Sequence, residues 1–370
     1  MNDYSGQNYL VWQTSKYTIS EFKKLSPKEQ LKYFCLTAHL SPSTHNTQPW
    51  RFEIYPEKME SIFFVDKKYI LPASDVHGRQ TIISCGCALK NIEISANYFG
   101  YSTEIKILNQ TTENFRPNES NAGLIALCKI NFFPDEENKD LSELYKAIFK
   151  RQVIRAEYDE QKDIPSEVLE KINSIDSGEI KIHLISDRWR RLSISEFQGQ
   201  ADNFVINSKK FSRELGEWLL PNNSENFVGM PGIGFGLSDE EAQRLHLGLK
   251  GETPLKPEDG LKFSLGGKIG IEKSPAVCFL TAQEDNIENW LNTGKIMEEI
   301  FLELTAQNIA FTVHAGIAEV SLINKLFSMS VLGTTRRIMS LFRIGYTKRP
   351  EDKKRPHSPR LPLEKIIINY

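Results

Sequence analysis

The sequence has few cysteines and no arrangement of residues that is typical of a metal site. Five of its 370 residues are cysteine, an odd number scattered from Cys35 to Cys278. They form no C-x-x-C pair and no Cys/His cluster with the spacing of zinc ligands. We therefore expect reduced thiols, and no metal site.

Long hydrophobic runs and an excess of charge are also missing. The start of the chain, Met1 to Ser5, has neither the basic nor the apolar region of a signal peptide, and no run of about 18 apolar residues occurs. Lys and Arg total 46 against 48 Asp and Glu, a formal net charge of −2. No general basic field is available to hold nucleic acid or an anionic membrane surface. We expect a cytoplasmic protein that binds neither.

The composition is that of a folded protein, with 40% hydrophobic and 25% charged residues. Ser26, followed by Pro27 and Glu29, predicts a capped helix start, and the apolar stripe that follows leads into a polar loop and two strands, residues 50–54 and 62–65. A further helix is predicted over residues 140–155.

Two parts of the chain resemble each other. Residues 27–31 recur at residues 165–169, with Pro, Glu and Leu in matching positions, an offset of 138. The helical pattern around Gly86 recurs around Gly294, an offset of 208. Repeats of this kind indicate a duplicated structural unit. The alternative is chance similarity between amphipathic helices.

The two offsets differ by about 70 residues, so the second copy should contain an insertion of that size. The region without a counterpart lies at about residues 189–262. We predict an α+β chain of two fused units, residues 1–145 and residues 146–370.

Residues 42–50, Pro-Ser-Thr-His-Asn-Thr-Gln-Pro-Trp, hold the densest set of polar groups. Hydroxyl groups, amides and an imidazole lie between two prolines that restrict the backbone, and both amides can donate and accept hydrogen bonds. Such a loop can bind a planar ligand with several polar atoms. A simple turn that connects a helix to a strand is the alternative.

The stretch from Ala38 to Trp50 resembles the motif A-x-x-A-P-S-x-x-N-x-Q-P-W of the nitroreductase family, and His45 before Asn46 is typical of its Acg-like branch. Downstream elements follow in the same order, so the resemblance covers about residues 26–367 and is weakest in the insertion. The family binds FMN. Its Acg-like members are similar to two nitroreductase protomers fused into one chain. The resemblance therefore implies a nitroreductase-like fold in two fused units, each with a central, mostly antiparallel sheet flanked by helices.

The resemblance also implies which residues hold the cofactor. Arg151 and Arg155 are the counterparts of a phosphate clamp, R-R-S-x-R, in which Gln152 and Val153 depart from the pattern, and Arg360 would compensate. The alternative is a solvated helix end with ion pairs. The candidate cofactor-binding residues in the motif loop are Pro42, Ser43, Thr44, His45, Asn46 and Gln48.

Each half has the part of the site that the other lacks. The positions 138 residues before the clamp arginines are Gln13 and Tyr17, which cannot bind a phosphate as arginines do, and residues 180–188 do not resemble the motif loop. One complete FMN site per chain is therefore expected. The chain would be a monomer that mimics a dimer, or would form a homodimer.

By the same resemblance, the turn formed by residues 314–317 should bring the backbone near flavin N5, with Ala315 and Gly316 as further candidate cofactor-binding residues. A loop glycine needed only for the turn is the alternative. No side chain is expected to act as a catalytic residue, because the reacting atom would belong to the flavin.

The insertion contains a glycine-rich apolar segment, residues 227–236, which is either a flap over a flat cofactor or a plain surface loop.

The resemblance and this segment together leave two candidate functions. The first is an oxidoreductase that transfers hydride from NADH or NADPH through FMN to a nitroaromatic, a quinone or a similar small acceptor. The second is a flavin-sequestering protein in which the flap excludes the nicotinamide.

Overall fold

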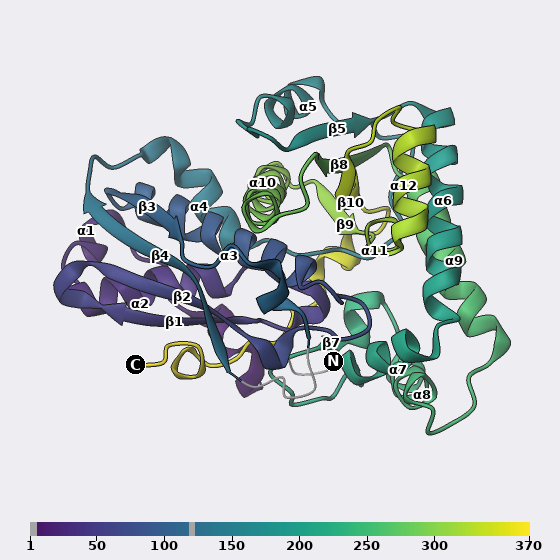
Figure 1. Cartoon of the computed structure of the whole chain (residues 1–370), viewed down its shortest axis with the longest axis horizontal. Coiled ribbons are helices and arrows are strands. Elements are labelled where there is room, and N and C mark those ends of the chain that lie inside the picture. The colour runs from purple at the N-terminus through teal and green to yellow at the C-terminus, as the bar shows by residue number, and fades with distance from the viewer. Residues whose placement is uncertain (1–5, 118–122) are drawn as a thin grey trace.

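The structure, a computed structural model, describes residues 6–117 and 123–370, and it contains two four-stranded sheets with helices packed on and between them (Figure 1). Part of the expectation about a signal peptide rests on residues 1–5, which lie outside this range. No helix among the described residues is both long and apolar enough to cross a membrane. The predicted α+β class with antiparallel sheets is confirmed.

The first sheet has the strand order β1-β2-β4-β3, and every neighbouring pair is antiparallel. The predicted capping box is present at the start of α2, where Ser26 accepts from the backbone of Glu29 and the carboxylate of Glu29 accepts from the backbone of Ser26. The elements of this part of the chain are α1 (Ile19–Phe22), α2 (Pro27–His39), β1 (Trp50–Tyr55), β2 (Glu60–Asp66), α3 (Arg79–Tyr98), β3 (Tyr101–Ile107), β4 (Leu124–Pro134) and α4 (Ser142–Ile148).

The second sheet has the order β5-β8-β10-β9, again antiparallel throughout. Helix and strand follow each other as in the first sheet, and α10 begins and ends 208 residues after α3. The same order of elements favours the two-unit interpretation, while the boundary at residue 145 stays a prediction. The elements are α5 (Ser166–Asn173), β5 (Lys181–Ile185), β8 (Ala276–Ala282), α10 (Ile287–Ala306), β9 (Ala310–Val313), α11 (Gly316–Glu319), α12 (Ser321–Ser330) and β10 (Arg337–Gly345).

The predicted helix over residues 140–155 is wrong in its second half. Helix α4 ends at Ile148, and the chain then runs extended, with the backbone N–H of Ile154 donating to the carbonyl of Phe311 at 3.0 Å. The hydrogen bond to the edge strand β9 stabilises the non-helical conformation, because it gives the backbone N–H of Ile154 the partner that it would otherwise find in a helix. Arg151 and Arg155 therefore lie on an extended segment beside the second sheet.

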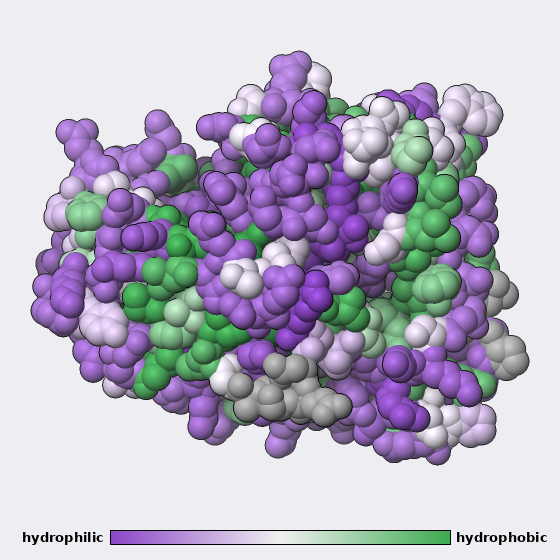
Figure 2. Space-filling model, viewed as in Figure 1, coloured by the Kyte–Doolittle hydropathy of each residue, from purple (hydrophilic) through white to green (hydrophobic). Residues whose placement is uncertain are grey.

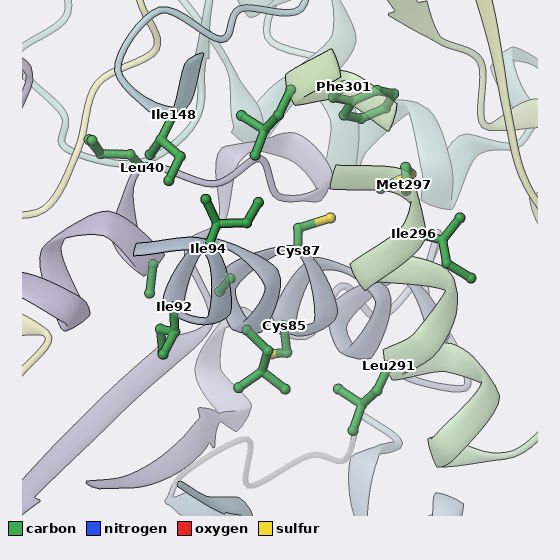
Figure 3. Close-up of a cluster of buried hydrophobic side chains, with 14 of the residues drawn as sticks. Leu40, Cys85, Cys87, Ile92, Ile94, Ile148, Leu291, Ile296, Met297 and Phe301 are labelled. Carbon is green, nitrogen blue, oxygen red and sulfur yellow. The ribbon is translucent and has the colours of Figure 1, made fainter. Parts of the chain in front are cut away.

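Helices α3 and α10 cross at Gly86 and Gly294. A Cβ atom on Gly86 would lie 2.9 Å from the Cα of Gly294 and still closer to the carbonyl oxygen of Leu291, and a Cβ on Gly294 would meet Gly86 and the carbonyl of Ile83 in the same way. Residues 83 and 291 are also 208 apart. Buried side chains of the two helices face each other around this crossing (Figure 3). The repeat in the sequence is thus reproduced as a reciprocal contact.

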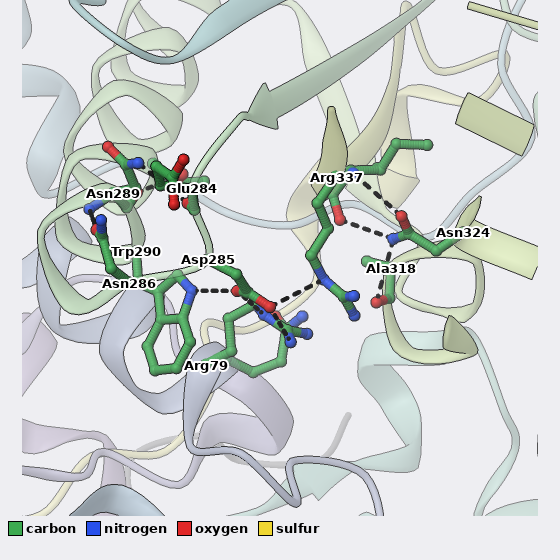
Figure 4. Close-up of polar contacts among 12 residues, drawn as sticks. Arg79, Glu284, Asp285, Asn286, Asn289, Trp290, Ala318, Asn324 and Arg337 are labelled. Carbon is green, nitrogen blue, oxygen red and sulfur yellow. Dashed lines mark hydrogen bonds and ion pairs between the residues drawn. The ribbon is translucent and has the colours of Figure 1, made fainter. Parts of the chain in front are cut away.

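A polar network also connects the two halves. Both carboxylate oxygens of Asp285 accept from the guanidinium of Arg79, at 2.9 and 3.0 Å, and one also accepts from the indole N–H of Trp290 (Figure 4). Burial opposes ionisation of Asp285, but the hydrogen bond and charge of Arg79 and the charge of Arg337 prevail and hold its pKa below the usual value. The start of α3 is thereby fixed to the segment that precedes α10.

The C-terminal segment leaves the second sheet and joins the first. Phe52 of β1 forms a parallel bridge with Ile367, and its backbone exchanges two hydrogen bonds of 2.7 Å with Ile366 and Ile368. The amide of Asn369 bonds both backbone groups of Ile54. The first sheet therefore includes residues from the end of the predicted second unit.

The predicted insertion, about residues 189–262, lies within the segment 186–275 that connects β5 to β8. Helices α6 and α9 pack together at one side of the molecule, with α7 and α8 below them (Figure 1). Exposed apolar side chains, Leu322, Leu326 and Met329, lie along the neighbouring helix α12 (Figure 2). The elements of the insertion are α6 (Arg188–Ile206), α7 (Lys209–Trp218), β6 (Leu219–Leu220), β7 (Met230–Pro231), α8 (Asp239–Lys250) and α9 (Pro257–Glu272).

Candidate functional site

Four segments that are far apart in the sequence enclose one small cavity of about 90 Å³. They are the motif loop at residues 42–46, the extended segment 151–155, the insertion segment 230–235 and the C-terminal segment 356–360, and Trp12 completes the wall. Of the predicted cofactor-binding residues, those that line the cavity are Pro42, Ser43, His45, Asn46, Arg151, Arg155 and Arg360.

The motif loop has an unusual backbone. His45, Asn46 and Gln48 adopt positive φ angles of 48°, 56° and 53°, a region that residues other than glycine seldom occupy. The loop is held by Ser43, whose hydroxyl accepts from the backbone of Gln48 at 2.9 Å, and by Ser84, whose hydroxyl accepts from the backbone of Thr44. Such a cluster of strained residues is more typical of a binding site than of a connecting turn.

The two amide side chains of the loop are engaged by other parts of the chain. Asn46 donates to the carbonyls of Gly229 and Pro359, both at 2.9 Å. Gln48 is fully buried, donates to the carbonyl of Phe227 at 2.7 Å, and accepts from the backbone of Leu361. They connect the loop to the glycine-rich segment and to the C-terminal segment, and Gln48 does not line the cavity.

Three arginines line the cavity, and each has a different set of partners. Arg151 lies 3.2 Å from the carboxylate of Glu298 and donates to the carbonyl of Leu40. Arg360 donates to Asn46 and to backbone carbonyls at the end of α2. The guanidinium of Arg155 lies over the ring of Phe235, 4.4 Å from its centroid, and no acidic residue among the lining residues that the structure describes neutralises it.

Burial and repulsion between neighbouring positive charges lower the pKa values of the basic side chains that line the cavity. Desolvation lowers the pKa of Arg360 to about 9 and that of Arg155 to about 10, and neighbouring arginines contribute in both cases. Burial and the charge of Arg155 lower the pKa of His45 to about 4, so its imidazole is neutral at pH 7. Within the described part of the chain, Nδ1 of His45 is buried without a hydrogen-bond partner. The cavity therefore has positive charge and an unused polar atom.

Ala315 and Gly316, predicted to approach flavin N5, lie outside the cavity lining. A Cβ on Gly316 would lie 2.6 Å from the amide of Gln198 and 2.7 Å from the carboxylate of Asp202, so helix α6 of the insertion packs directly on this turn. The preceding residue, His314, is half-buried, and its Nε2 atom is buried without a hydrogen-bond partner among the described residues. The role of the turn stays a prediction.

Two stacked rings, Trp12 and His357, form one side of the cavity and could not be predicted from the sequence. The rings of Trp12 and His357 stack with centroids 3.9 Å apart and planes inclined by 15°, and the indole N–H donates to the carbonyl of Ser358. Gln152, which departs from the motif, donates to the carbonyls of Arg355 and Pro356. A tryptophan near the start of the chain gives no local signal that it will meet residues near the other end.

Several carboxyl groups lie near one another where the insertion meets the turn at 315–319. Burial raises the pKa of Glu319 to about 8, with further repulsion from Asp75, Asp202 and Glu214, and burial raises the pKa of Asp202 to about 7. The native protein thus keeps protons that an unfolded chain would release near pH 4. The free energy of unfolding should fall as the pH rises from about 4 to 8, because the unfolded state then binds fewer protons than the native state.

We expect Glu319→Gln to remove part of this pH dependence, since the amide stays neutral. Urea unfolding at pH 5.5 and pH 8 would measure it: the variant should lose less stability between the two values than the unaltered protein. Glu240→Gln, an exposed position on α8, is the matched control and should leave the difference unchanged. If the free energy of unfolding changed by the same amount between pH 5.5 and pH 8 in all three proteins, Glu319 could not be protonated in the native state.

Comparison with known proteins gives a distant but consistent result. No protein-family model matches the sequence. An uncharacterized protein from Mycobacterium tuberculosis is 25% identical over 348 residues, 91% of this chain and 92% of that protein. Another protein of that organism, named "Putative NAD(P)H nitroreductase acg", is 22% identical over 332 residues, 88% of this chain and 92% of its own length.

Among solved structures, the crystal structure of a protein from Anabaena variabilis, described as a nitroreductase by similarity, covers 94% of this chain and 93% of its own. The TM-score is 0.50 and the sequence identity 12%, which supports a shared fold over the full length. The likeness spans both sheets and the insertion together. The chain is therefore distantly homologous to Acg-like proteins named "Putative NAD(P)H nitroreductase" over most of its length, and its fold is nitroreductase-like.

Proposed function

We propose that the protein binds one FMN per chain at this cavity and transfers electrons from NADH or NADPH to a small acceptor such as a nitroaromatic or a quinone. The observation that carries the proposal is the convergence of the motif loop with Arg151, Arg155 and Arg360 around one cavity, whose described lining residues include no carboxylate. The relative named "Putative NAD(P)H nitroreductase acg" agrees with this reaction class.

The donor groups of the cavity fit FMN in kind. Arginine binds phosphate through bidentate, charge-assisted hydrogen bonds, and no carboxylate among the lining residues that the structure describes would have to give up Arg155. His45 Nδ1 is a buried polar atom that a ligand could satisfy, and Trp12 and His357 offer flat apolar faces. A dianionic phosphate ester attached to an aromatic ring system matches this set.

The volume of the cavity fits only part of FMN. Ligand pockets commonly measure about 300–1,000 Å³, whereas this cavity measures about 90 Å³. Ile233 and Phe235 of the insertion supply the wall that can move most simply, because both are only partly buried and lie on a short turn between glycines. Binding of a whole FMN therefore requires segment 227–236 to shift.

In this proposal the residues have distinct tasks. Arg155, with Arg151 and Arg360, would bind the phosphate, and the motif loop would orient the ring system, with Ser43 and Asn46 nearest to it. Bound FMN supplies the two-electron redox chemistry. Helix α6 covers the turn that contains Ala315 and Gly316. This turn would therefore present its backbone to the flavin only after the insertion has moved.

The second candidate function, flavin sequestration, is favoured by one specific observation. The glycine-rich segment is bonded to the motif loop through Asn46 and Gln48, and the backbone N–H of Gly229 donates to the carbonyl of Asn46. A segment fixed in this way would cover a bound flavin and exclude a nicotinamide, whose reacting carbon must come within about 3–3.5 Å of the flavin.

Anaerobic addition of NADH or NADPH to the FMN-loaded protein separates the two functions. If the protein is an oxidoreductase, one of the two nicotinamides should bleach the flavin absorbance. If it sequesters flavin, only dithionite should bleach the unaltered protein, and Ile233→Ala with Phe235→Ala should make the flavin reducible by a nicotinamide. Trp189→Ala, on the exposed side of the insertion, is the control. Resistance of both the unaltered protein and the double variant to both nicotinamides would contradict the oxidoreductase.

A further inference from the structure

Glu298 is a carboxyl group enclosed in the protein directly behind the cavity. It lies on α10, its side chain has no exposed surface, and its nearest charge is Arg151, whose Nε is 3.2 Å from a carboxylate oxygen. Within the described part of the chain, neither carboxylate oxygen has a well-formed hydrogen bond. A buried charge with so few partners depends strongly on its ion pair with Arg151.

The groups around Glu298 come from three parts of the chain. Cys87 and Asn91 face it from α3, Arg151 from the segment after α4, and Arg360 from the C-terminal segment. Burial raises the pKa of Glu298, and the charges of Arg151 and Arg360 oppose this effect. Cys87 stays a neutral thiol, because burial and the charge of Glu298 raise its pKa well above the usual value. The protonation of Glu298 is therefore coupled to the two arginines.

Comparison of the two halves indicates that this carboxyl belongs to the site. The position 208 residues earlier, on α3, is Lys90, which forms an ion pair with Glu299 at 2.7 Å near the surface. The counterpart of Arg151 in the first half is Gln13, which is exposed. The half that keeps the clamp arginine thus also has the buried carboxyl, and the other half has neither.

An anion that binds Arg151 must share its guanidinium with Glu298. Two negative charges on one buried cation repel each other, and the repulsion is relieved if the carboxyl accepts a proton from solvent. The arginine would keep its position, because the neutral carboxylic acid still packs in the same place and can still accept a hydrogen bond.

We propose that Glu298 is a proton-linked positioning residue, which holds Arg151 at the cavity and takes up a proton from solvent when a phosphate group binds to that arginine. The inference rests on the proposed function, since the phosphate group is that of FMN. It adds a property that a purely structural ion pair would not have: binding is linked to proton uptake.

Calorimetric titration with FMN at pH 8, in two buffers with different ionisation enthalpies, measures the protons exchanged. The second pKa of a phosphate ester is about 6, so FMN is already a dianion at this pH and contributes little. We expect uptake of up to about one proton per FMN, and an affinity that falls by up to about tenfold per pH unit above neutrality.

Glu298→Gln should abolish the uptake and flatten the pH dependence between pH 7 and 9, so that its affinity at pH 8 exceeds that of the unaltered protein. Glu299→Gln is the matched control, because it changes the neighbouring residue on the same helix, which contacts Lys90 near the surface. The control should retain the proton uptake of the unaltered protein.

The outcomes separate the two proposals. FMN binding without proton uptake in the unaltered protein, or persistent uptake in Glu298→Gln, would overturn the role of Glu298 and leave the FMN site standing. Absence of FMN binding at every pH would overturn the proposed function and this inference with it. If Glu298→Gln does not fold, the measurement on the unaltered protein alone decides.

Discussion

Gly294→Ala should destabilise the protein by about 3 kcal/mol, a large cost for one methyl group. The new Cβ would collide with the backbone of α3 at Gly86 and at the carbonyl of Ile83. Backbone atoms cannot rotate away as a side chain does, so the two helices would have to separate along buried surface. Gly86→Ala should have a similar effect, and the two costs should not add, because both changes act on one contact.

Gly266→Ala is the control for this prediction. Gly266 is exposed on helix α9, and a Cβ there would meet no atom within 4 Å. The same chemical change should stabilise the protein there by about 0.5–1 kcal/mol, through the higher helix propensity of alanine. Chemical denaturation of the three variants gives the comparison. If Gly294→Ala behaved like the control, the helix backbones could not be in contact at this crossing.

Arg155→Ala should weaken FMN binding by about 10- to 150-fold, which corresponds to about 1.5–3 kcal/mol for a lost charge-assisted hydrogen bond. Its thermal stability should not fall, because Arg155 is repelled by Arg343 and Arg355 and forms no ion pair with a carboxylate in the described part of the chain. Fluorescence titration of FMN and thermal unfolding, measured on the same sample, test both parts.

Arg151→Ala makes a useful contrast, since it should weaken FMN binding and also lower the stability. Removing this arginine would leave Glu298 buried without its ion-pair partner, a change that commonly costs about 3–5 kcal/mol. Arg188→Ala, an exposed position in the insertion, should change neither quantity. If Arg155→Ala left FMN affinity unchanged, the phosphate would have to bind elsewhere.

The parts of the fold that could be predicted from the sequence are those with a strong local pattern. The capping box at Ser26 predicts the start of α2 from residues a few positions apart, and the repeat around Gly86 and Gly294 predicts that α10 corresponds to α3. The contact of the two helices at these glycines was not predicted. The motif loop could be found in the sequence because its polar residues lie within nine positions of one another.

Contacts that depend on distant parts of the chain could not be predicted. Residues 151–155 have a helical pattern but lie extended, because the edge of β9 offers Ile154 a backbone partner more than 150 positions away. Likewise, nothing near Trp12 in the sequence indicates that it stacks on His357. Glu298 resembles an ordinary surface glutamate until the packing of α3 against α10 encloses it.

The pairing of the C-terminal segment with β1 has a consequence for synthesis. Ile54 and Asn369 are 315 residues apart in the sequence yet bond to each other. At roughly 5–20 residues per second, the ribosome needs roughly 15–60 s to make the second partner after the first. During that interval the outer edge of β1 has no strand to cover it, and an uncovered edge can pair with another chain. For most of its translation, a nascent chain of this protein therefore exposes the unpaired backbone groups of β1, and a chaperone that binds this edge would prevent aggregation.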